Sequence, residues 1–204
     1  MRRTLAVGYA KESTMNYSEI KYCDIANGEG VRTSLFVSGC RRHCPFCFNE
    51  EAQDFAAGKP FDAVVEDAIL ESLEPGYVDG LTLLGGEPME PENQRGLVGF
   101  VERVKDRFPS KSIWCFTGDV LSELEEGGRH HTEVTDRLLA CVDILVDGPY
   151  VQAQYDITLR FRGSANQRII DLNATRAAAA ERGVPLSEAV CLWQDDPVFS
   201  THSM

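Results

Sequence analysis

The sequence predicts an α/β fold with a parallel sheet, and three observations predict it. Short apolar runs alternate with helical patterns along the chain. The runs lack strict polar alternation, as expected for strands that are buried on both faces of a parallel sheet. The 204 residues are enough for one globular domain with a full hydrophobic core. Repetition of strand, helix and strand therefore favours parallel strands joined by right-handed crossovers.

Five segments are predicted as strands because each is short and rich in branched or aromatic apolar residues. They are residues 32–38, 79–85, 111–117 and 142–148, with a weaker candidate at 167–172.

Four segments have apolar residues at helical spacing. Residues 61–73 place Val64, Val65, Ala68, Ile69 and Leu73 on one stripe, and residues 94–108 do the same with Leu97, Phe100, Val101, Val104 and Phe108. Residues 132–142 and 172–183 are the other two helices, and Gly183 stands at a C-cap position of the last.

Charge and composition exclude several classes of protein. Twenty basic and thirty-two acidic residues give a net charge of −12, which disfavours binding to nucleic-acid phosphate. No apolar run approaches the roughly 20 residues that cross a bilayer, and the N-terminal apolar stretch is too short for a signal sequence. We expect a cytoplasmic protein. Seven cysteines suit metal binding or catalysis better than a disulfide framework.

Polar or glycine-rich loops follow four of the predicted strands. They are the cysteine-rich loop "GCRRHCPFCFN" (39–49), "GGEP" (85–88), "TGD" (117–119) and "DGPY" (147–150). The carboxyl ends of parallel strands meet at one edge of a sheet, where ligands bind. The sequence therefore predicts a functional site at this edge.

The first of these loops holds Cys40, Cys44 and Cys47 at C-x3-C-x2-C spacing. Thiolates bind zinc, copper(I) or iron–sulfur clusters, and a structural zinc site needs four protein ligands. His43 is adjacent to Cys44 and poorly placed to share one tetrahedral ion with it, while Cys23 is a remote fourth candidate. A cubane cluster with three cysteines instead leaves one iron open. The spacing alone leaves zinc, chance and an iron–sulfur cluster as alternatives.

The "GGEP" loop offers main-chain groups and a carboxylate. Gly85 and Gly86 allow close approach of a ligand to the backbone, Glu87 suits an ammonium group, and Pro88 stiffens the exit. A tight turn that leads into a helix near Pro91 explains the same residues equally well.

Taken together, the two motifs resemble those of the radical S-adenosylmethionine enzymes. Further segments, "LTLLGGEPMEPEN", "KSIWCFTG", "DILVDGPYVQ" and "RFRGSANQRII", look in order like the activating proteins of anaerobic ribonucleoside-triphosphate reductase. The resemblance covers residues 15–171 and implies a partial (β/α) barrel of about five to six parallel strands. Residues 1–14 are an N-terminal extension, or Met15 is the true start. Residues 172–204 are a helix closing the barrel, a docking tail or disorder.

The resemblance implies a [4Fe–4S] cluster on Cys40, Cys44 and Cys47, with S-adenosylmethionine on the open iron and no catalytic side chain beyond the cluster ligands. The residues implied to bind S-adenosylmethionine are Phe46 and Phe48 beside the cluster ligand Cys47, then Gly85, Gly86 and Glu87 for the methionine ammonium, and Thr117 and Asp147 for the ribose or methionine end. Ordinary turns also explain Thr117 and Asp147.

The implied reaction is one-electron reductive cleavage of S-adenosylmethionine to a 5′-deoxyadenosyl radical, which takes hydrogen from a glycine of the reductase. Reduced flavodoxin or a similar protein is the implied electron donor. Two rivals remain: an activase of another glycyl-radical enzyme such as pyruvate formate-lyase, and a non-catalytic zinc or iron–sulfur binding module.

Arg160, Arg162 and Arg168 form either a solvated loop or a contact with the cofactor carboxylate or the partner. Cys115 and Cys141 are predicted to be buried small hydrophobes.

Overall fold

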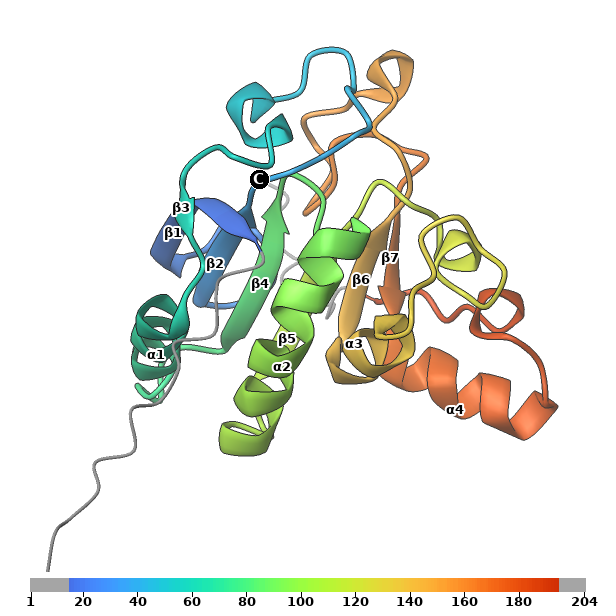
Figure 1. Cartoon of the computed structure of the whole chain (residues 1–204). Coiled ribbons are helices and arrows are strands. Elements are labelled where there is room, and N and C mark those ends of the chain that lie inside the picture. The colour runs from blue at the N-terminus through green and yellow to red at the C-terminus, as the bar shows by residue number, and fades with distance from the viewer. Residues whose placement is uncertain (1–14, 195–204) are drawn as a thin grey trace, which may run out of the picture.

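A computed structural model describes residues 15–194, which form one seven-stranded mixed sheet and four α-helices (Figure 1). The sheet order is β3-β1-β2-β4-β5-β6-β7. The strands are β1 Asn16–Asp24, β2 Arg32–Val37, β3 Lys59–Pro60, β4 Gly80–Gly85, β5 Ser112–Phe116, β6 Ile144–Asp147 and β7 Arg168–Asp171. The helices are α1 Ala63–Ser72, α2 Pro91–Arg107, α3 Thr135–Cys141 and α4 Leu172–Arg182. The α/β class is thereby confirmed.

The direction of the strands corrects the expected count of five to six parallel strands. Parallel pairing joins β2, β4, β5 and β6, whereas β1, β3 and β7 are antiparallel to the strands they pair with. The connection from β6 to β7 contains no α-helix, and Gln167 Nε2 donates to Gly148 O at 3.0 Å, so the chain returns where it left. A parallel return would need a crossover to the far edge, and β7 therefore runs back antiparallel.

Two strands, β1 and β3, were not predicted from the sequence. β1 is half-exposed along most of its length and alternates polar with apolar residues, unlike the apolar runs of the central strands. β3 has only two residues, both exposed. β3 is the edge strand, and β1 pairs with it only through Asn16 and Tyr17, so most of β1 is open on that side as well. A search for continuous apolar runs misses strands that bury little of either face.

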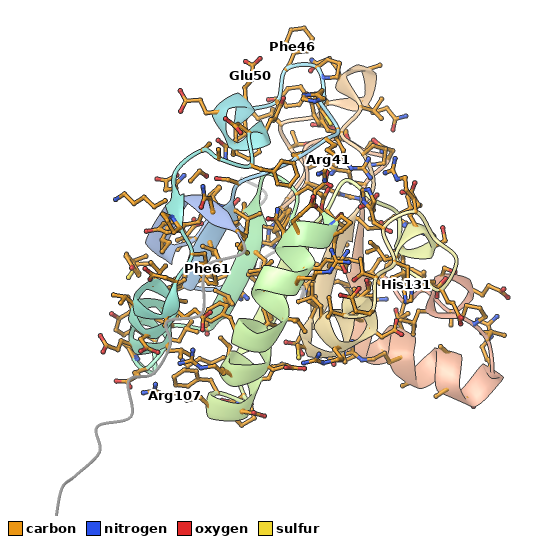
Figure 2. All side chains as sticks on the ribbon, in the orientation of Figure 1. Arg41, Phe46, Glu50, Phe61, Arg107 and His131 are labelled. Atoms are coloured by element: carbon orange, nitrogen blue, oxygen red, sulfur yellow. The ribbon has the colours of Figure 1, made fainter. Side chains whose placement is uncertain are left out.

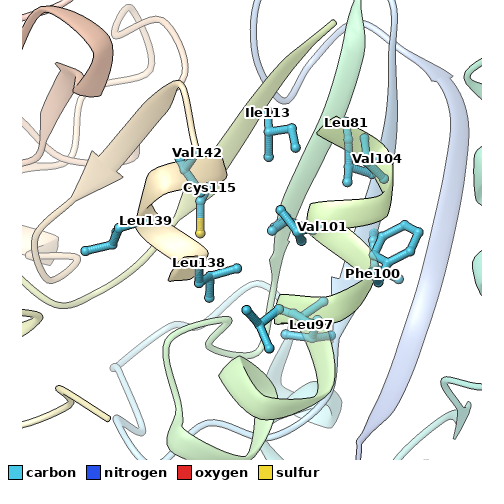
Figure 3. Close-up of a cluster of buried hydrophobic side chains, with 14 of the residues drawn as sticks. Leu81, Leu97, Phe100, Val101, Val104, Ile113, Cys115, Leu138, Leu139 and Val142 are labelled. Carbon is cyan, nitrogen blue, oxygen red and sulfur yellow. The ribbon is translucent and has the colours of Figure 1, made fainter. Parts of the chain in front are cut away.

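The helices cover one face of the sheet, and alternation along the strands separates the two faces. On β5, Ile113 and Cys115 join a large core with side chains of all four helices, and Figure 3 shows α2 and α3 packed over this part. Trp114 points the other way into a smaller apolar cluster, with Phe161 and Trp193 packed against it. The predicted burial of Cys115 is confirmed.

Helix boundaries agree with the sequence patterns to within a few residues. The predicted buried face is wrong in part for one helix, α1. In α2, Leu97, Phe100, Val101 and Val104 are buried as predicted, and the helix begins at Pro91. In α1, however, Val64 is 76% exposed and Ala68 is also exposed, whereas Leu70 is buried. Asp62 caps this helix by accepting from Val64 N and Val65 N at 3.0 Å each, so Val64 lies in a first turn that faces solvent.

Residues 172–194 pack against the same sheet. Asp171 caps α4 by accepting from Ala174 N at 2.9 Å, and Gly183 ends it with φ of 64°, as predicted. Trp193 N then donates to Ile169 O at 2.9 Å. The expectations for residues 1–14 and for the tail after residue 194 lie outside the described residues.

No helix within residues 15–194 has the length and apolar character needed to cross a membrane.

Candidate metal centre

The loops that follow β2, β4, β5 and β6 converge on one pocket at the carboxyl ends of these strands, as the sequence predicts. The pocket has a volume of about 550 Å³. Its lining includes all three cysteines of the first loop together with Gly85, Gly86, Glu87, Thr117, Gly118 and Gly148. Residues of the segment 150–167 line a further wall, and Ala26 and Asn27 of the loop before β2 also contribute.

The cysteine loop, defined as residues 39–49, is closed by backbone hydrogen bonds between its first residues and the short helix that follows it. Gly39 has φ of 99° and donates its N–H to Ala52 O at 2.7 Å, while Cys40 N donates to Gln53 O at 3.1 Å. Ala52 and Gln53 belong to a short 3₁₀ helix that follows the loop. The loop is therefore closed on itself, and its three thiols project from a fixed base.

The three thiols are partly buried and form no disulfide. Burial raises the pKa of Cys40 to about 11, although a hydrogen bond from the Arg42 backbone opposes the shift. Burial also raises the pKa of Cys44, against the charge of Arg42. Thiols in this environment become thiolates when a metal centre supplies positive charge, because metal binding displaces the proton.

The donor set fits a multi-iron cluster better than a single ion. Within residues 15–194, no three His, Cys, Asp or Glu side chains are close enough to hold one metal ion. Zinc at about 2.3 Å from each sulfur would need thiolates about 3.8 Å apart. A cubane takes each thiolate on a different iron, which suits thiols that are spread along the wall of a pocket.

The remaining zinc ligand candidates point elsewhere. The ring of His43 makes a 2.7 Å hydrogen bond between Nδ1 and Gln53 Oε1. Cys23 is exposed on β1 and does not line the pocket.

The paired glycines of the second loop are required by two different close contacts, Gly85 by its contact with strand β2 and Gly86 by its contact with the cysteine loop and the 3₁₀ helix after it. Gly85 has φ of 113°, and a Cβ on it would lie 2.6 Å from Val37 N. A Cβ on Gly86 would lie 2.6 Å from Gly39 O and 2.7 Å from Ala52 O. Gly86 thus allows the second loop to touch the backbone of the cysteine loop, and Gly85 allows it to leave β4 close against β2, in addition to any approach of a ligand.

Glu87 lines the pocket, but its carboxylate already has protein partners. It is 2% exposed, and its two oxygens accept from Met89 N at 2.9 Å and from Gly118 N at 2.8 Å. Burial raises its pKa, and the charge of Asp119 adds to the shift. The carboxylate therefore joins the loops after β4 and β5, and its binding of an ammonium group stays a prediction.

The structure separates the two residues that were expected at the ribose or methionine end. Thr117 lines the pocket, whereas Asp147 does not. Asp147 follows Val146, whose side chain faces the pocket side of the sheet, so alternation turns the carboxylate to the helical side. There it is buried, accepts from Leu121 N at 2.9 Å and pairs with Arg168. A direct cofactor contact by Asp147 is not supported by this geometry.

Phe46 and Phe48 both border the pocket, and each is 82% exposed. Phe46 has φ of 60° and lies at the outer tip of the molecule in Figure 2. Both rings are thus free to cover a ligand at the mouth of the pocket.

Sequence reasoning missed part of the lining. Arg42 and the aromatic residues Tyr150, Tyr155 and Phe161 contribute to it, and none has a motif that identifies it. Of the arginines for which the sequence predicts either a solvated loop or a contact with cofactor or partner, Arg162 lines the pocket, whereas Arg168 pairs with Asp147.

Comparison with known proteins agrees with this geometry. Residues 26–170 match the family model described as a 4Fe-4S single cluster domain. The chain is 43% identical over 157 residues to the anaerobic ribonucleoside-triphosphate reductase-activating protein of Haemophilus influenzae, which covers 76% of this chain and 97% of that protein. The proteins of the same name from Escherichia coli K12 and Enterobacteria phage T4 are 38% and 35% identical over 155 residues each. These alignments cover 75% and 76% of this chain, and 96% and 93% of the relatives. The chain therefore belongs to the family of anaerobic ribonucleoside-triphosphate reductase-activating proteins and carries its 4Fe-4S single cluster domain.

Proposed function

We propose that this protein is a radical S-adenosylmethionine enzyme that generates a glycyl radical on anaerobic ribonucleoside-triphosphate reductase. One observation carries the proposal: three cysteine thiols line a pocket of about 550 Å³ that opens beside them. That volume lies within the range of small-molecule sites. A purely structural metal site has no need of a ligand pocket next to its donors.

In this proposal Cys40, Cys44 and Cys47 hold the [4Fe–4S] cluster, and S-adenosylmethionine occupies the adjoining pocket. When bound, the reduced cluster supplies the electron that cleaves S-adenosylmethionine to methionine and a 5′-deoxyadenosyl radical. The chain itself binds, orients and shields the reactants. The backbone of Gly85 and Gly86 and the side chain of Thr117 face the ligand, and Phe46 and Phe48 cover it from the solvent side.

The same proposal includes the setting of the reaction. The glycine-bearing segment of the reductase approaches the open mouth of the pocket, and reduced flavodoxin or a similar protein delivers the electron in the cytoplasm. The parallel strands β2, β4, β5 and β6 with their helices are compatible with a partial (β/α) barrel, which also stays part of the proposal.

Two rivals are separable by experiment. An activase of another glycyl-radical enzyme, such as pyruvate formate-lyase, would use the same cysteines and pocket, and only the partner differs. The names of the relatives favour the reductase. A non-catalytic zinc or iron–sulfur module would hold its metal without any response to S-adenosylmethionine.

The first test is anaerobic reconstitution with iron and sulfide, followed by reduction and EPR spectroscopy. We expect a [4Fe–4S]⁺ signal that changes when S-adenosylmethionine is added and is lost in Cys44→Ala. Cys141→Ala is the matched control, because Cys141 is also partly buried but lies in α3, away from the pocket. A cluster indifferent to S-adenosylmethionine, or a preference for zinc, would contradict the proposal. Radical formation on purified pyruvate formate-lyase but not on the reductase would reassign the partner.

A further inference from the structure

Arg41 and Arg42 are consecutive residues of the cysteine loop, but their side chains bind different parts of the protein. Arg41 N donates to Glu90 Oε1 at 2.7 Å, and its guanidinium pairs with Glu90 at 2.5 Å and with Glu92 at 2.6 Å. Figure 2 shows Arg41 above the N-terminal end of α2. Its side chain is 56% exposed and does not line the pocket. Arg41 therefore fastens the outside of the loop to α2.

Arg42 turns inward instead. Its side chain is 14% exposed and lines the pocket together with the three cysteines. The guanidinium forms a close ion pair with Asp119, and its Nε lies 3.4 Å from Glu87 Oε2. Arg42 thus links the cysteine loop to the loops after β4 and β5.

The "TGD" loop is shaped to receive this side chain. A Cβ on Gly118 would lie 2.5 Å from both Cδ and Nε of Arg42, so a larger residue would displace the arginine. The next residue, Asp119, is fully buried and also accepts from Arg129 and His130 at 2.7 Å each. Burial opposes its ionisation, but these hydrogen bonds and the charge of Arg42 prevail and lower its pKa. Asp119 is therefore a fixed anion that anchors Arg42.

We propose that Arg42 is a positioning residue for the iron–sulfur cluster, which fixes the cysteine loop on Glu87 and Asp119 and keeps a permanent positive charge beside the cluster ligands. The inference rests on the proposed function in one respect, namely that these cysteines hold a redox-active cluster. The spacing of the cysteines alone gives no indication of this role of Arg42.

A positive charge at this place has a predictable effect. Reduction adds one negative charge to the cluster, and a nearby guanidinium shielded from solvent favours that state. Replacing Arg42 also leaves the buried carboxylates of Glu87 and Asp119 without this partner, which acts in the same direction. The cluster of such a variant should therefore be harder to reduce.

The test compares Arg42→Gln with Arg41→Gln, two adjacent variants that remove the same charge. In the reconstituted full-length protein we expect Arg42→Gln to disfavour reduction about tenfold, which is a fall of about 59 mV for a one-electron couple. Arg41→Gln should leave the midpoint potential unchanged, and Arg42→Lys should restore most of it. Iron content and the EPR-monitored titration are the measurements.

A second variant covers the case in which Arg42→Gln fails to retain a cluster. Gly118→Ala keeps every charge but pushes Arg42 aside, and we expect it to lower iron retention and the potential in the same direction. Equal potentials in Arg42→Gln and Arg41→Gln, or a normal potential in Gly118→Ala, would overturn the inference. Loss of the S-adenosylmethionine response in the unmodified protein would instead overturn the proposed function, while the comparison of potentials would still stand.

Discussion

At the residue scale, Arg32 is the most unusual side chain of the sheet. It is fully buried on β2 and uses its guanidinium to join three strands. Its acceptors are Thr82 Oγ1, Leu81 O and Ser112 O, each at 2.7 Å, with Ser112 Oγ and Glu29 O at 3.0 Å. Burial lowers its pKa to about 10, so it stays charged at neutral pH. Its cost of burial is offset by these hydrogen bonds.

We expect Arg32→Met to lower the free energy of unfolding by about 3 kcal/mol or more, because several buried acceptors lose their donor at once. Urea denaturation of the apo protein measures this. Arg103→Met is the control: Arg103 is 47% exposed and pairs with Glu66 and Asp67 on the surface, so its loss should cost less than about 1 kcal/mol. Similar losses in both variants would show that the hydrogen bonds of Arg32 contribute little.

Single residues also mark the limit of what the sequence could predict about the site. The three cysteines and the glycine pair were found because their spacing along the chain is fixed by local chemistry. Arg42 and Asp119 were missed because they meet only through the tertiary fold, 77 positions apart. Asp147 was predicted to contact the ligand because it ends a strand at the predicted site. Side chains alternate along β6, however, and this alternation places Asp147 on the helical face of the sheet.

At the scale of elements, the end of α4 follows directly from one residue type. Gly183 adopts a left-handed conformation with φ of 64°, and a Cβ there would meet nothing within 4 Å. Any cost of a larger residue is therefore a cost of backbone conformation alone.

We expect Gly183→Ala to reduce the free energy of unfolding by about 1 kcal/mol, with a lower Tm in thermal denaturation. Gly76→Ala makes the same chemical change where the added Cβ is equally free and the φ is not positive. It should be neutral or slightly stabilising, because alanine restricts the unfolded chain. If both variants had the same Tm, the helix end would not depend on the left-handed residue.

The remaining elements show which features of the fold an apolar sequence pattern can predict. The four central strands were predicted because burial on both faces makes them continuous apolar runs, and the four helices because burial of one face gives them a helical period. Strands β1 and β3 bury little, so they lack a continuous apolar run. The direction of β7 depends on where the preceding connection returns to the sheet, so it cannot be predicted from the residues of the strand itself.

At the scale of the whole molecule, the two faces of the sheet have different tasks. The helical face carries the large core, whereas the opposite face carries the pocket and a small aromatic cluster of Trp114, Phe161 and Trp193. The ring centroids lie 5.2 Å apart for Trp114 and Phe161 and 5.5 Å apart for Trp114 and Trp193. Phe161 also lines the pocket, so the segment after α4 supports the pocket wall from behind.

We therefore expect Trp193→Ala to lower stability by about 2 kcal/mol, less than a fully buried aromatic would. It should also weaken the proposed binding of S-adenosylmethionine roughly fivefold, or about 1 kcal/mol. Leu192→Ala is the control, since Leu192 is 58% exposed and adjacent in sequence. Denaturation and equilibrium binding to the reconstituted protein measure the two effects. Because Trp193 acts through Phe161, its replacement should weaken binding little further in a Phe161→Ala background. Additive losses of affinity would mean that Trp193 reaches the pocket by another route, and unchanged affinity in Trp193→Ala would confine it to stability.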